Sequence, residues 1–118
     1  MLSVFIAELL EVANIFNVLH WQCGSKAEHE YLKKIYDLLR DSADKYAELH
    51  LFELDGIQFK NSYSSTPYSK DAALALLMKV REDILYYSKM SDSIADQNFF
   101  GGLLEEFETS INLFKRFS

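Results

Sequence analysis

The sequence predicts an all-α fold, an up-down bundle of four helices with one long crossover between the second and the third. Apolar residues recur at intervals of three and four along most of the 118 residues, which is the period of a helix that faces a core. Glycine and proline are scarce, at 4 and 1 residues, and no strand-like alternation is present. Because this length is typical of one domain, we take residues 1–118 as a single domain.

The first helix is expected from about Ser3 to Trp21, and it is apolar on most sides. Ser3 can serve as the N-cap, and Gly24 lies just past the end. So wide an apolar surface predicts that more than one neighbour covers it. Glu8 and Glu11 interrupt the stretch, which also lacks the basic start and the small-residue cleavage site of a targeting segment. We therefore expect a core helix of a cytoplasmic protein with no membrane contact.

The second helix is expected from about Lys26 to Leu54. Its apolar positions follow helical spacing for many turns: Leu32, Ile35, Leu38, Leu39, Ala43 and Tyr46, with Leu49 at the margin. His50 falls inside this apolar band, so we expect a buried, hydrogen-bonded core histidine. Residues 57–69 form a long, serine-rich connection that holds the one proline, and such a connection can cross a bundle from end to end.

The third and fourth helices are expected over about Lys70 to Met90 and Asp96 to Arg116. The fourth helix should turn a row of apolar side chains inward: Phe99, Phe100, Leu103, Leu104, Phe107, Ile111 and Phe114. Gly101 and Gly102 stand in its first turns, where each costs about 1 kcal/mol relative to alanine. We expect the close approach of another backbone at these glycines, because the lack of a side chain permits it.

Charge and cysteine content narrow the classes of function. The net charge is −6, whereas sequence-independent nucleic-acid binding needs a basic face that displaces counterions. One cysteine cannot form an internal disulfide, which fits a reducing compartment. That cysteine, Cys23, has no second cysteine and no convincing base beside it, so we do not expect a catalytic thiol.

Rare residues gather where the first two helices meet. The stretch LHWQCGSKAEHE, Leu19 to Glu30, holds two of the three histidines and the only tryptophan and cysteine. On a helical wheel, His29, Asp44 and Glu48 share a polar flank of the second helix. A histidine and two carboxylates suit ferrous iron, manganese or zinc. However, His29 and Asp44 lie about 22 Å apart along the axis, so a metal site requires a second subunit.

These residues resemble the signature of the Dps miniferritins, the DNA-protection proteins of the ferritin-like superfamily. The matching pieces are HWQCG, HEYLK and DKYAE, and the clear match covers about a quarter of the chain. The resemblance implies a ferritin-like bundle in a homo-oligomer built on a two-fold dimer. It also implies iron sites at the two-fold interfaces, with His20 and His29 from one subunit and Asp44 and Glu48 from its mate as ligands, and ferroxidase activity where the site is intact.

The chain also departs from that family. Lys33 stands where the family places an acidic ligand, one turn after His29. The turn between His20 and His29 is shorter, the basic DNA-binding tail is missing, and the chain is shorter than typical members. Such a reduced form is expected in phage or mobile-element genomes, by analogy alone.

The same four residues also have interpretations that involve no metal. His20 can cap the last carbonyls of its helix, and His29 can be an ordinary exposed residue. Asp44 and Glu48 can belong to a solvated face. Two functions therefore stand side by side. One is a reduced miniferritin that binds and oxidises ferrous iron between subunits, and the other is a metal-free structural or interaction bundle.

The first testable prediction is that the protein does not bind duplex DNA at physiological salt. A net charge of −6 and the lack of a lysine-rich tail leave too few cations to displace phosphate counterions. A gel-shift assay at about 150 mM salt checks this. Binding at low-micromolar protein concentration would contradict it.

Overall fold

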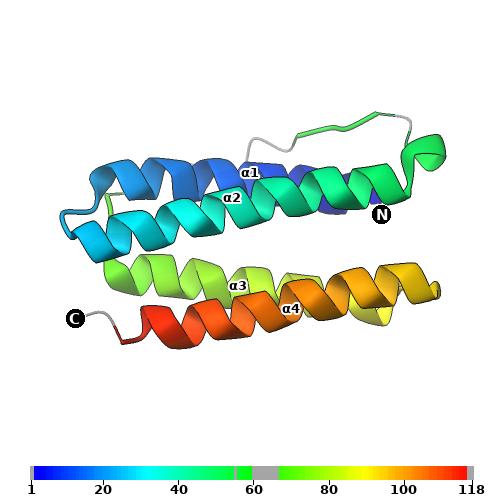
Figure 1. Cartoon of the computed structure of the whole chain (residues 1–118). Coiled ribbons are helices and arrows are strands. Elements are labelled where there is room, and N and C mark those ends of the chain that lie inside the picture. The colour runs from blue at the N-terminus through cyan, green and yellow to red at the C-terminus, as the bar shows by residue number, and fades with distance from the viewer. Residues whose placement is uncertain (1, 55, 60–66, 117–118) are drawn as a thin grey trace. The chain divides into compact units, whose positions relative to one another are not determined.

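The computed structural model describes residues 2–54, 56–59 and 67–116 (Figure 1). These ranges contain four α-helices and no strand. The helices are α1 (Leu2–Gln22), α2 (Lys26–Leu49), α3 (Lys70–Lys89) and α4 (Ile94–Phe114), and a 3₁₀ turn, η1 (Leu51–Glu53), follows α2. The predicted all-α class is therefore confirmed.

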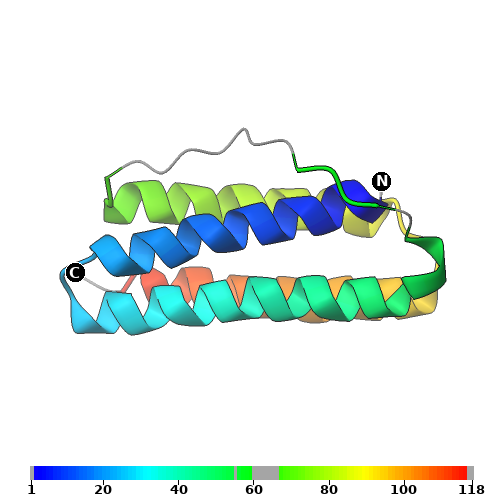
Figure 2. The ribbon, with the colours of Figure 1, turned by 90° about the horizontal axis from the view of Figure 1, so that it is seen from above.

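The helices form two antiparallel pairs that belong to two compact units, Met1–Tyr68 and Ser69–Ser118 (Figure 2). In the first unit α1 packs against α2, and in the second α3 packs against α4. A longer connection joins α2 to α3, as expected. That the chain forms one domain over residues 1–118 stays a prediction.

The long connection has described residues at both of its ends, 56–59 and 67–69. It leaves α2 at the end marked by His50, yet the Tyr68 hydroxyl interacts with Glu28 in the first turn of α2. The described ends of the connection therefore lie at opposite ends of α2, as the predicted end-to-end crossover requires. Residues 60–66 in its middle lie outside the described residues.

Three helix boundaries differ from the sequence prediction. Ser3 lies inside α1, so it is not the N-cap. α2 ends at Leu49 instead of Leu54, because His50 leaves the helical conformation and its N–H bonds to the Ala47 carbonyl. α4 begins at Ile94, because the Ser93 hydroxyl accepts the Asp96 N–H at 3.0 Å and caps the helix.

The core of the first unit follows the predicted helical spacing. α1 buries a broad set of side chains: Phe5, Ile6, Ala7, Leu9, Val12, Ala13, Phe16, Leu19 and His20. α2 buries Leu32, Ile35, Leu39, Ala43 and Tyr46 among others, while Leu38 is half-buried and Leu49 is exposed. Phe5 meets Tyr46 edge to face at 5.2 Å between ring centroids, which ties α1 to α2 far from their turn.

Within the described residues, α1 is long and apolar enough to cross a membrane, judged by length and composition. Its most apolar 18-residue window has a mean hydropathy of 1.7, and 44% of that window is buried inside the chain. Core helices of soluble proteins and N-terminal signal sequences share these properties. The expectation that the protein does not enter a membrane therefore stays a prediction.

The second unit confirms the inward row on α4 and corrects the reading of its glycines. Six of the seven expected side chains are buried, and Leu104 is half-buried. Gly101 and Gly102 are exposed, and a Cβ added at either would meet nothing within 4 Å of the described atoms. Within the described residues of the second unit, the expected close approach of another backbone is therefore wrong.

The second prediction follows from these open glycines. Gly101→Ala and Gly102→Ala should each stabilise the protein by up to about 1 kcal/mol, since alanine loses less backbone entropy in a helix. Thermal unfolding followed by circular dichroism should show a rise in Tm of about 4 °C per substitution. A fall in Tm would indicate that the glycine face is covered in the assembled protein.

Candidate metal centre

A link of three residues joins α1 to α2 and brings the two helix ends together. The amide of Cys23 still bonds to the Leu19 carbonyl at 3.2 Å, so the chain leaves α1 in a helical path. Ser25 then adopts an extended conformation and caps α2, because its hydroxyl accepts the Glu28 N–H at 3.3 Å. The last turn of α1 and the first turn of α2 are therefore direct neighbours.

This turn places His20 and His29 side by side. Their ring centroids lie 4.7 Å apart. The Nδ1 of His29 lies 2.6 Å from the backbone oxygen of His20, and a carbonyl can only accept, so Nδ1 is the donor. In neutral His29 the proton is therefore on Nδ1, and Nε2 carries the free lone pair. Metal-binding histidines commonly have this arrangement, in which a carbonyl fixes the tautomer and the ring orientation.

His20 is a buried histidine with an unsatisfied ring nitrogen. Its side chain lies in the last turn of α1, and the residue is only 8% exposed. Its Nδ1 has no hydrogen-bond partner among the described residues. A buried polar atom left unpaired costs about 1–3 kcal/mol. The carbonyl-capping role considered for His20 therefore does not account for this nitrogen.

The two carboxylates expected as ligands are not brought to the histidines within one chain. Asp44 and Glu48 are exposed on α2, one turn apart. Asp44 lies fifteen residues beyond His29 on the same helix, a separation of about 22 Å. Residues 2–54, 56–59 and 67–116 contain no group of three or more His, Cys, Asp or Glu side chains that could hold a metal ion.

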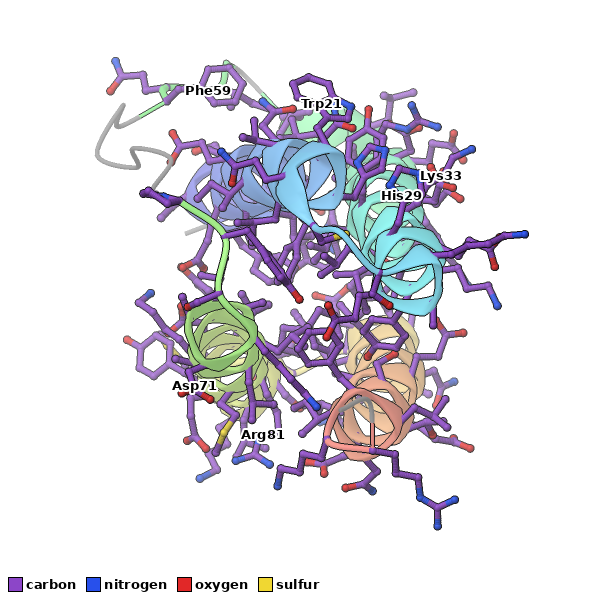
Figure 3. All side chains as sticks on the ribbon, turned by 90° about the vertical axis from the view of Figure 1, so that its left-hand side faces the viewer. Trp21, His29, Lys33, Phe59, Asp71 and Arg81 are labelled. Carbon is purple, nitrogen blue, oxygen red and sulfur yellow. The ribbon has the colours of Figure 1, made fainter. Side chains whose placement is uncertain are left out.

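Lys33 and Trp21 flank the histidine pair. Figure 3 shows Trp21, His29 and Lys33 close together at the turn between α1 and α2. Lys33 is exposed one turn after His29, and Trp21 is 66% exposed with its ring 6.0 Å from that of His20. The neighbourhood of the two histidines is thus open to an incoming molecule, and it carries lysine cations: Lys33 one turn after His29 and Lys26 one turn before it.

The Cys23 thiol lies in the turn between α1 and α2 and is partly buried. Its Sγ lies 3.6 Å from the His20 carbonyl oxygen and 3.8 Å from that of Ser25. Partial burial raises the pKa of the Cys23 thiol, and the Glu28 carboxylate raises it further. The thiol is therefore protonated at neutral pH and is a poor nucleophile or metal ligand.

Two residues beside the histidines were not predicted from the sequence. Glu28 is buried in the first turn of α2, and the oxygen of Tyr68 is buried at the end of the long connection. Burial and the Glu28 carboxylate both raise the pKa of Tyr68. The two groups interact, but their geometry falls short of a well-formed hydrogen bond. Ser25 followed by Glu28 is a capping-box pattern that could have identified Glu28, whereas no pattern points to Tyr68.

His50 is not the buried core histidine expected from the sequence. It caps the C-terminal end of α2, and its side chain keeps 16% of its surface exposed. Its Nδ1 lies 3.4 Å from Glu53 Oε2, and its ring packs on Tyr46 at 4.8 Å. Its position at the far end of α2 separates it from the histidine pair.

No family model, no curated protein and no solved structure matches this chain.

The third prediction concerns alkaline stability. Because folding raises the pKa of Tyr68, the folded state favours the protonated phenol, and this stability is lost as pH rises above about 10. The Tm of Tyr68→Phe should therefore fall less than the Tm of the native protein between about pH 9 and pH 11. Circular dichroism melts over this range measure the difference.

The matched control is Tyr86→Phe, because Tyr86 is an exposed tyrosine of α3. This variant should lose Tm in parallel with the native protein. Cys23 is present in all three proteins, so its own titration cancels in the comparison. Equal losses in all three would show that Tyr68 does not titrate as a buried group.

Proposed function

We propose that the chain is a reduced, ferritin-like protein whose ferrous-iron site lies between two subunits and is weakened by Lys33. His20 and His29 supply nitrogen ligands from one subunit, and Asp44 and Glu48 supply oxygen ligands from its mate. Iron is the substrate here: where the site is complete, each bound Fe²⁺ gives one electron to dissolved dioxygen and becomes Fe³⁺. In this proposal the four helices form one ferritin-like domain, the protein is cytoplasmic, and α1 is a core helix.

The hydrogen bond from His29 to the His20 carbonyl is the observation that carries this proposal. It directs the proton to Nδ1 and leaves Nε2 of His29 as a lone-pair donor beside the second ring. The unsatisfied Nδ1 of buried His20 is a second feature that a ligand would relieve. Two imidazoles at this separation supply part of a coordination shell that suits ferrous iron, manganese or zinc.

The need for a second subunit follows from the same geometry. The histidine pair lies beside the start of α2, with His20 in the last turn of α1, and the exposed carboxylates lie toward the end of α2. One straight helix cannot bring its own two ends together. Two copies of α2 that run antiparallel bring the start of each helix to the end of the other. Both ligand types then meet twice, once on each side of the two-fold axis.

Lys33 favours a second candidate function, a metal-free interaction protein. Its ammonium lies one turn from His29 on an exposed face, close to where a divalent cation would be held. A fixed positive charge there opposes the cation and offers the partner's carboxylates an ion pair instead. We therefore expect the native protein to bind iron weakly or not at all.

The fourth prediction tests this role of Lys33. Lys33→Asp should raise the affinity for Fe²⁺ at least about tenfold, because it removes the opposing charge and adds an oxygen ligand. Anaerobic titration with Fe²⁺ can be followed by the fluorescence of Trp21, the only tryptophan, whose ring lies 6.0 Å from that of His20. Oxidation of the bound iron on admission of air is the second measurement.

Lys34→Asp is the matched control, since it makes the same charge change at the next exposed residue, away from the flank of His29. It should leave the affinity unchanged. His29→Ala added to Lys33→Asp should abolish the gain. Stoichiometric, tight iron binding by the native protein, or no gain in Lys33→Asp, would contradict this account of Lys33.

A further inference from the structure

We draw no further inference here: the strongest candidate, the patch of exposed apolar side chains on α3 and its C-cap (Met78, Leu85, Tyr86 and Met90), carries none because nothing in the structure shows what covers it.

Discussion

The hydrogen bond from His29 to the His20 carbonyl is the constraint on which the first unit depends. It forms at 2.6 Å between the last turn of α1 and the first turn of α2. Ser25 makes this hydrogen bond possible. As the N-cap it starts α2 directly after a link of three residues, which keeps His29 close to the end of α1. Once this contact sets the axial position of α1 against α2, the helical period aligns their apolar residues, as far along as the pair of Phe5 and Tyr46.

Three ionisable groups near that hydrogen bond determine the charge at the turn between α1 and α2. Glu28, Tyr68 and Cys23 interact with one another near this turn, and burial raises the pKa of both the Tyr68 phenol and the Cys23 thiol. Both groups therefore stay protonated at neutral pH, and Glu28 supplies the negative charge among them. Because Tyr68 comes from the end of the long connection, the same contact holds that connection at the beginning of α2.

The sequence was sufficient to predict those features that depend on the spacing of apolar residues and on composition. The class, the approximate helix ranges and the neighbouring positions of His20 and His29 follow from apolar spacing and a short link. Helix ends were less predictable, because His50 and Ser93 act through backbone conformation and caps that compete with periodicity. Tyr68 could not be found at all, since its partner Glu28 is distant in sequence and a serine-rich connection has no period to align them.

The charges near His29 bear differently on the two candidate functions, the iron site and the metal-free interaction protein. A divalent cation requires a site whose nearby charges are mainly negative, whereas the charges on the outward face of α2 alternate in sign around Asp37 and Arg40. With Lys33 beside His29, the two proposed carboxylates of a mate already have a cation to neutralise them. A metal ion must then displace the Lys33 ammonium from these carboxylates. Because that ammonium is part of the protein, its effective concentration at the site is high. The position of Lys33 therefore weighs against tight metal binding in the proposed site, and Lys33→Asp separates the two candidate functions.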